Sequence, residues 1–184
     1  CGKLLKVNIP EGVTSIPAGT FSGCESLVEM QLPTSITFIG RCSFAKCSNL
    51  QKINIPEGIT TIYMGVFYAC ESLSEVELPT SIISIDENSF EKCCQLRKIN
   101  IPEGVTTIGN EAFHGCESLI ELHLPTSITS IGARSFYLCS NLQRINLPEG
   151  ITKIPKGAFY GCESLVEIRL PKSITSIGNW SFLG

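Results

Sequence analysis

Cysteine is the residue in this sequence whose type and spacing could support chemistry. Ten cysteines occur among 184 residues, a high proportion that would fit a disulfide framework. Eight of them follow one another at intervals of 23 residues, at positions 1, 24, 47, 70, 93, 116, 139 and 162. A thiol in such a column could be a nucleophile, a metal ligand, half of a disulfide or a packing residue. The elements that position the cysteines distinguish these roles.

The same interval governs the prolines and the phenylalanines. Prolines stand at positions 10, 33, 56, 79, 102, 125, 148 and 171, and phenylalanines at 21, 44, 67, 90, 113, 136, 159 and 182. Eight units fill the chain without insertion or deletion: 1–23, 24–46, 47–69, 70–92, 93–115, 116–138, 139–161 and 162–184. A 46-residue superperiod lies above them, because odd units read N-[IL]-P-E-G where even units read L-P-[TK]-S. Units this small cannot bury their own apolar residues, so we expect them to stack as one domain, 1–184.

Each unit contains a segment with the alternation of a half-buried strand. In the second unit the apolar Met30 and Leu32 flank the polar Gln31, which is a period of two residues. Pro33 cannot donate a backbone hydrogen bond and ends the strand. The P-T-S or P-E-G that follows favours a turn, after which the V-T-S-I segment turns back toward the core. The segment before each phenylalanine reads as a loop or a short 3₁₀ turn, and no long helix fits.

This unit resembles the leucine-rich repeat, whose strand motif L-x-x-L-x-L stands here as L-V-E-M-Q-L from Leu27 to Leu32. Over the whole chain the pattern is similar to the BspA-like class, L-x-x-[IVL]-x-[IVL]-P-x-x-[VIL]-x-x-I-G-x-x-[AS]-F-x-x-C. The glycine of that pattern is present in four of the eight units, at Gly40, Gly109, Gly132 and Gly178. The resemblance implies a right-handed leucine-rich-repeat solenoid, mostly β, with a strand on the concave side of each turn. It also implies a role in surface attachment or protein recognition without catalysis.

The regular spacing of the eight cysteines favours packing over chemistry. They share the interval of the inward leucines and phenylalanines, and free cysteine is among the most buried residue types. Neighbouring strands lie about 4.8 Å apart, whereas a disulfide needs converging Cβ atoms about 3.8 Å apart. We therefore expect these thiols to be reduced and unreactive. Cys42 and Cys94 lie outside the column, and two alternatives are open for them. They are either exposed thiols that could form an intermolecular disulfide, or partly buried thiols.

The remaining residues carry no motif for catalysis, a cofactor or a metal. His114 and His123 match no H-x-x-x-H helix, and no glycine-rich phosphate loop, G-x-S-x-G or paired C-x-x-C occurs. A thiol-active protein, suggested by the adjacent Cys93 and Cys94, is a minor alternative. The net charge of −3 does not favour nucleic acid, and no apolar run reaches the ~20 residues of a membrane span. The tripeptide N-W-S makes Asn179 a candidate glycosylation site.

Two outward columns of the strand could carry recognition. The first alternates in sign at every unit and is a predicted charge ladder: Lys6, Glu29, Lys52, Glu75, Lys98, Glu121, Arg144 and Glu167. Opposite charges on neighbouring strands attract and oppose a shift of register. The second column keeps asparagine in odd units and varies in even ones. With the residues beside it, it gives the candidate concave-face contacts Gln31, Glu77, His123, Arg169, Val28, Ser74, Ile120 and Val166.

The uniformity of these columns favours a structural or adhesive scaffold over a reader of one ligand. Neither end has a polar capping unit, since Leu4 and Val7 open the chain and Phe182 closes it. The superperiod stays in phase if unit eight is followed by unit one, where Glu167 would face Lys6. We expect an extracellular or cell-surface scaffold, part of a longer array or a filament, whose partners are copies or neighbouring repeats end to end. A host or matrix protein, or a glycan, on the concave face is the alternative.

Overall fold

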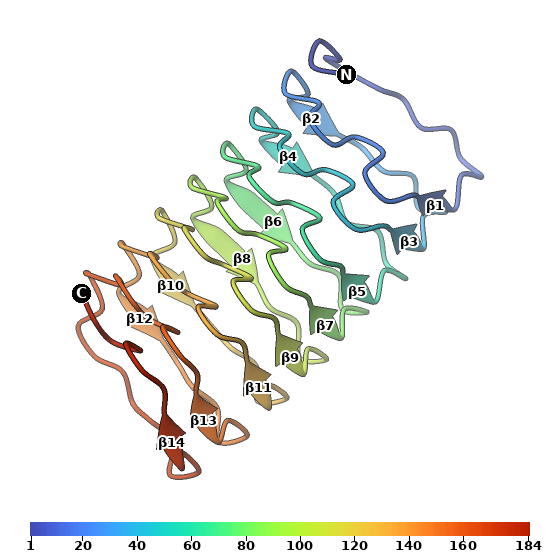
Figure 1. The fold of residues 1–184 in the computed structure, drawn as a ribbon. Coiled ribbons are helices and arrows are strands. Elements are labelled where there is room, and N and C mark those ends of the chain that lie inside the picture. Colours follow the sequence, from blue (N-terminus) through green and yellow to red (C-terminus); the bar gives the residue numbers. More distant parts are fainter.

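The chain winds into an elongated solenoid in which each 23-residue unit forms one rung (Figure 1). The structure is a computed structural model that describes residues 1–184, and the two termini lie at opposite ends of the stack. Two columns of short parallel strands run along it, joined by turns and extended segments, and no helix is present. The predicted mostly β solenoid without long helices is therefore confirmed. No helix has the length and apolar character that a membrane crossing requires.

The first strand column is the one that the alternating segment predicted. Its strands are β2 (Glu29–Met30), β4 (Lys52–Ile53), β6 (Glu75–Glu77), β8 (Lys98–Asn100), β10 (Glu121–Leu122) and β12 (Arg144–Ile145). Their charged residues are exposed and the apolar residues that follow are buried. Strand β2 pairs with β4, β6 with β8 and β10 with β12. Pairing in this column thus occurs wherever an even unit is followed by an odd one.

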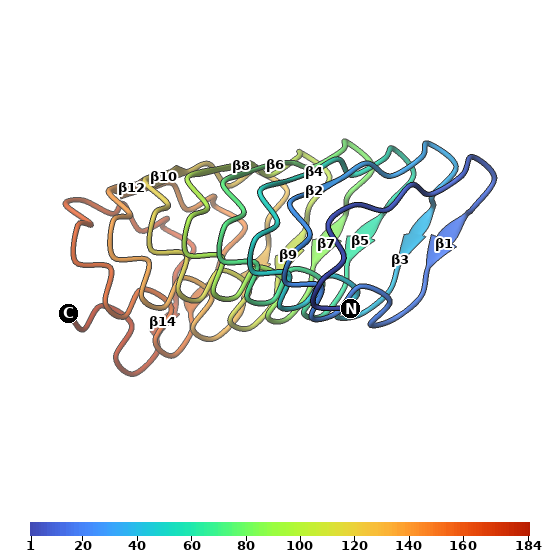
Figure 2. The same ribbon diagram turned by 90° about the horizontal axis from the view of Figure 1, so that it is seen from above.

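A second strand column lies in the segment that the sequence indicated only as a return toward the core. It comprises β1 (Ser15–Ile16), β3 (Phe38–Ile39), β5 (Thr61–Ile62), β7 (Ser84–Ile85), β9 (Thr107–Ile108), β11 (Ser130–Ile131), β13 (Lys153–Ile154) and β14 (Ser176–Ile177). Figure 2 shows the two columns on different sides of the stack. Strand β1 pairs with β3, β5 with β7, β9 with β11 and β13 with β14. These are the junctions from an odd to an even unit, and β7 also pairs with β9.

Two different side-chain bridges explain the 46-residue superperiod. At even-to-odd junctions the side-chain amide of Asn54 accepts from the backbone N–H of Leu32 at 2.7 Å and donates to its carbonyl oxygen at 2.9 Å. Asn100 and Asn146 bridge Leu78 and Leu124 in the same way. At odd-to-even junctions a serine hydroxyl donates to the carbonyl of the preceding rung at 2.6–2.7 Å, from Ser35, Ser81, Ser127 and Ser173. Each type of junction therefore has its own polar bridge.

The third side of the rung is a loop that places phenylalanine and cysteine in the core. The phenylalanine rings stack from Phe21 to Phe182, with centroids 5.3–5.9 Å apart. Backbone hydrogen bonds join the loops, as from the N–H of Phe67 to the carbonyl of Ser89 at 2.8 Å. The loop of every rung contains residues with positive φ. At one such position unit three has Gly65 and unit two has the partly buried Cys42.

Seven of the eight column cysteines are buried, as the spacing predicted, and Cys1 is exposed. All ten cysteines have free thiols. From Cys47 onward, each column thiol donates to the carbonyl oxygen of the phenylalanine 26 residues earlier in the chain, at 3.1–3.2 Å. Burial raises the pKa of Cys47 to about 11 and that of Cys162 to about 12. The column thiols therefore pack as small apolar residues with one weak donor.

The two cysteines outside the column are partly buried rather than fully exposed. Cys42 lies against the carbonyl of Met64, with its sulfur 3.8 Å from that oxygen. Burial, and then the nearby carboxylates of Glu117 and Glu71, raise the pKa of Cys94. The sequence left open whether Cys42 and Cys94 are exposed or partly buried, and the structure shows that both are partly buried. A raised pKa leaves less thiolate at neutral pH, so Cys94 is a weaker nucleophile than a free thiol.

We predict that thiol labelling of the folded chain modifies three of the ten cysteines and leaves the seven buried ones unmodified. Iodoacetamide should modify Cys1, Cys42 and Cys94 in the folded chain, because the others are buried. Peptide mass mapping after timed quenching measures this, and the same reaction in denaturant should reach all ten. Rapid native modification of six or more thiols would contradict the packing role.

Thiol burial also predicts a loss of stability at alkaline pH. The pKa of Cys47 is raised from an ordinary 9.0 to about 11, so only the unfolded chain ionises readily between these values. Its contribution to stability is complete below pH 9 and is lost as the pH rises toward 11. Urea midpoints at pH 7 and 10.5 test this, and Cys47→Ala should make the decline shallower. Equal midpoints for the native chain at both pH values would disprove the prediction.

Candidate functional site

The predicted charge ladder lies on the exposed side of the first strand column. The backbone register sets Glu29 opposite Lys52, and the same holds for Glu75 with Lys98 and for Glu121 with Arg144. One ion pair forms along it, from Arg144 Nη2 to Glu121 Oε2 at 3.2 Å. The ladder is therefore a set of facing pairs at even-to-odd junctions and not a continuous chain of ion pairs.

The end members of the ladder have no facing partner. Glu167 binds Arg169 of its own rung instead, with 3.0 Å between Oε1 and Nε. Lys6 lies in the first rung and is exposed. Because pairing in this column requires an even unit followed by an odd one, both residues stand at junctions that the 184-residue chain leaves open.

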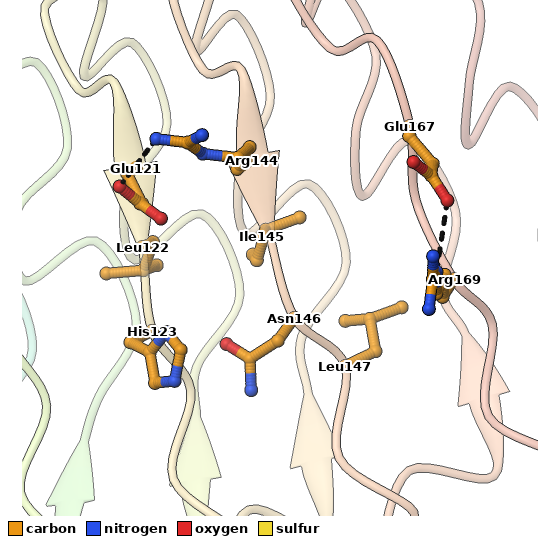
Figure 3. Close-up of a pocket in the computed structure, with 9 residues that line it drawn as sticks. All are labelled: Glu121, Leu122, His123, Arg144, Ile145, Asn146, Leu147, Glu167 and Arg169. Carbon is orange, nitrogen blue, oxygen red and sulfur yellow. Dashed lines mark hydrogen bonds and ion pairs between the residues drawn. The ribbon is translucent and has the colours of Figure 1, made fainter.

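The variable residues of the second outward column fall into two groups. His123 and Arg169 line one groove of about 340 Å³ over units six to eight, shown in Figure 3. Its other lining residues are Glu121, Leu122, Arg144, Ile145, Asn146, Leu147 and Glu167. Gln31, Ser74 and Glu77 line a second groove of about 340 Å³ over units two to four. The structure thus brings together variable residues two rungs apart, across an intervening asparagine rung.

The two grooves differ in charge. The first contains two carboxylates, two guanidinium groups and His123, and the second contains three carboxylates and one lysine. In Figure 3 the Arg144 and Arg169 side chains point to their carboxylates, while Asn146 is held by its bridge to Leu124. The lining residues include no serine, threonine or cysteine in the first groove. Both are open polar surfaces suited to contact with a polar ligand.

The apolar members of the predicted contact set stand beside these grooves. Val28 and Ile120 are about half exposed and Val166, in the last rung, is 90% exposed. The backbone carbonyls of Val28 and Ile120 accept hydrogen bonds from the next rung, from the N–H of Gln51 and Gln143 at 2.8 Å each. These positions therefore belong to the even-to-odd junction as much as to the exposed face of the first strand column.

The candidate glycosylation site is only partly open in the fold. The Asn179 side chain is exposed. The Ser181 hydroxyl of the same tripeptide is buried and lies 2.6 Å from the carbonyl oxygen of Gly178 and 3.0 Å from that of Pro155. Glycosylation at Asn179 stays a prediction.

Sequence reasoning missed one polar cluster, on the loop side. Glu91, Glu111 and His114 place one ligand atom each within 4.8 Å of one another. Spacing along the chain hid it, because Glu91 and His114 are 23 residues apart. Reading the loop column from rung to rung would have placed the two side by side.

Parallel strands stacked in columns, rungs of constant length and an outward polar face define a solenoid repeat protein whose sites are open surfaces. The BspA type leucine rich repeat region, in six copies, matches residues 1–120 and 84–184. The chain belongs to this family, which confirms the resemblance found in the sequence. No curated protein matches it in sequence.

Solved structures of bacterial leucine-rich repeat proteins share the fold. One from Bacteroides ovatus is 27% identical, with a TM-score of 0.73 over 97% of this chain. The T. pallidum leucine rich repeat protein is 32% identical, with a TM-score of 0.62 over 92% of this chain and 69% of its own. One from Eubacterium ventriosum is 23% identical, with a TM-score of 0.74 over 92% of this chain. This chain spans 58% and 57% of the Bacteroides and Eubacterium proteins.

The facing pairs predict a small, salt-dependent effect of charge reversal. Glu121→Lys should destabilise the chain by up to about 1 kcal/mol at low ionic strength, because it replaces an exposed ion pair with like charges. Glu75→Lys, which faces Lys98 without an ion pair within 4 Å, should do the same to a smaller extent. Thermal unfolding at low and high salt measures both, and the loss should shrink with salt. A loss that salt leaves unchanged would exclude charge as the cause.

Proposed function

We propose that this chain is a non-enzymatic, extracellular scaffold that acts by display and contact, and that its end rungs stack end to end, either on further copies in a filament or on neighbouring repeats in a longer array. The observation that carries the proposal is the open even-to-odd junction at each end. Inside the stack this type of junction is closed three times, by strand pairing and by the bridges of Asn54, Asn100 and Asn146. The last unit is even and the first is odd, so joining them repeats the internal design.

The two ends present complementary halves of that junction. At one end Asn8 is exposed and has no rung on which to place its amide. At the other end Leu170 occupies the position that Leu32, Leu78 and Leu124 hold inside the stack. The exposed Lys6 and Glu167 would face each other as Lys52 faces Glu29. A second copy, or a neighbouring repeat, placed in register supplies these partners.

Apolar surface at both ends supports the same association. Leu5 is 70% exposed in the first rung. In the last rung Val166 is 90% exposed and Trp180 is 59% exposed. Exposed apolar residues gathered at one edge mark interaction surfaces. An end-to-end contact is heterologous and does not close on itself, so it produces a filament.

The extracellular location rests on the family. The chain belongs to the BspA type leucine rich repeat region, and the resemblance to that class implied surface attachment. The buried thiols and the uniform outward columns are compatible with display of a surface, since neither provides a catalytic group.

Recognition of a protein or glycan ligand is the second candidate function. The groove that holds His123 and Arg169 favours it, because these are variable residues gathered on an otherwise uniform face. A matched pair of variants, His123→Asn and Arg169→Asn, would give these even units the asparagine that the odd units have at the same position. Loss of adhesion to a matrix surface in these variants, with self-association intact, would favour this function over the first.

Sedimentation velocity over a wide concentration range tests the filament. We expect concentration-dependent association of the 184-residue chain, weakened roughly tenfold or more by Asn8→Ala, since two hydrogen bonds are lost. Glu167→Lys should also weaken it. The matched control Asn54→Ala removes an internal bridge and should lower the melting temperature without changing association. A monomer at all concentrations, or association indifferent to Asn8→Ala and Glu167→Lys, would refute the proposal.

A further inference from the structure

The loop side of units four and five brings one imidazole and two carboxylates together. His114 Nδ1 lies 3.7 Å from Glu91 Oε1 and 3.5 Å from Glu111 Oε2. Glu91 is 8% exposed, and Glu111 and His114 are partly buried. Glu91 comes from unit four and the other two residues from unit five, so the cluster spans a junction between rungs.

The ring nitrogen at the centre of this cluster lacks a hydrogen-bond partner. His114 Nδ1 is buried and unpaired, although buried polar atoms are almost always paired in native proteins. Both carboxylate oxygens are too far away for a hydrogen bond, which needs about 2.7–3.2 Å between nitrogen and oxygen. The spacing leaves room for a cation between the nitrogen and the two oxygens.

Each carboxylate is oriented toward His114 by a partner on its other oxygen. Asn88 Nδ2 donates to Glu91 Oε2, which leaves Oε1 facing the ring. Arg134 Nη1 donates to Glu111 Oε1 at 3.2 Å, which leaves Oε2 facing the ring. Outer partners of this kind fix metal-binding side chains in position. The two carboxylates exceed the single guanidinium in charge, so the cluster is net negative.

The distances fit a small divalent ion. Zinc binds histidine nitrogen and carboxylate oxygen at about 2.0–2.2 Å in tetrahedral geometry, which sets neighbouring ligand atoms about 3.4 Å apart. The observed distances of 3.5 and 3.7 Å from His114 Nδ1 to the two carboxylate oxygens are close to this ligand-to-ligand separation and are longer than hydrogen bonds. We propose that Glu91, Glu111 and His114 form a binding site for a divalent transition-metal ion such as Zn²⁺, with one position left for water.

This site would act as a clamp between two rungs. An ion held by Glu91 of one rung and by Glu111 and His114 of the next opposes separation of the two rungs. Because the ion binds the folded chain and not the unfolded chain, it raises the free energy of unfolding. Glu91 and His114 occupy the same loop position in consecutive rungs. In the other rungs this position holds Ser22, Ala45, Tyr68, Tyr137, Tyr160 and Leu183, so no other junction has this pair. The clamp therefore belongs to one junction and is independent of the ends and of the concave face.

Isothermal titration with zinc ions tests the site. The chain is first alkylated with iodoacetamide under native conditions, because Cys1, Cys42 and Cys94 could also bind zinc. We expect one zinc ion per chain, bound at least tenfold more weakly after His114→Gln or Glu91→Gln. The control Glu117→Gln removes an exposed carboxylate of unit six outside the cluster and should leave the affinity unchanged.

A second readout separates loss of binding from loss of folding. Zinc should raise the melting temperature of the native chain and not that of His114→Tyr, which installs the residue that units three, six and seven carry at this place. That variant should melt cooperatively without zinc. Absence of saturable zinc binding in the native chain, or equal zinc affinity in the native chain and both His114 variants, would overturn the proposal.

Discussion

The constant length of the rung is the constraint on which the rest of the structure depends. Every residue of the core lies on its own equivalent from the neighbouring rung, as in the continuous ring stack from Phe21 to Phe182. Each column must therefore consist of a residue type that packs against itself. Flat rings, branched aliphatic chains and small thiols meet that condition, and one inserted residue would displace every column beyond it.

Polar contacts determine which rung follows which. Even-to-odd junctions use the first strand column and asparagine, and odd-to-even junctions use the second strand column and serine, with the added β7–β9 pair as the exception. An even rung stacked on the even rung of Leu78 would place Gln31, Glu77, His123 or Arg169 where an odd rung has asparagine, and the asparagine bridge to the backbone of Leu78 would be lost. Buried or half-buried backbone groups without partners are unfavourable. The superperiod thus fixes register in steps of two units, while the apolar columns alone would accept steps of one.

The fold could be predicted from the sequence because its information lies in simple intervals. The strand at Glu29–Met30, the inward cysteines and the absence of long helices all follow from the 23-residue period. The second strand column was missed because two residues such as Ser15–Ile16 are too short to show an alternation. The asparagines of the odd units were predicted to face outward, and they are exposed, but the sequence did not indicate that the amides of Asn54, Asn100 and Asn146 bond to the preceding rung. Side-chain contacts across rungs depend on geometry that intervals do not contain.

The same distinction explains why the column cysteines serve for packing while other positions could serve for binding. The carbonyl of Phe113 accepts from the N–H of Cys116, three residues later, and from the thiol of Cys139, 26 residues later, each at 3.2 Å. Alanine could fill part of the space but could not donate across the junction, and a column repeated without change leaves no rung distinct from the others. Selectivity requires positions that vary. These are the even rungs of the first strand column, the loop position of His114 and the two end rungs. Binding is therefore expected where the repetition is interrupted, and packing where it is complete.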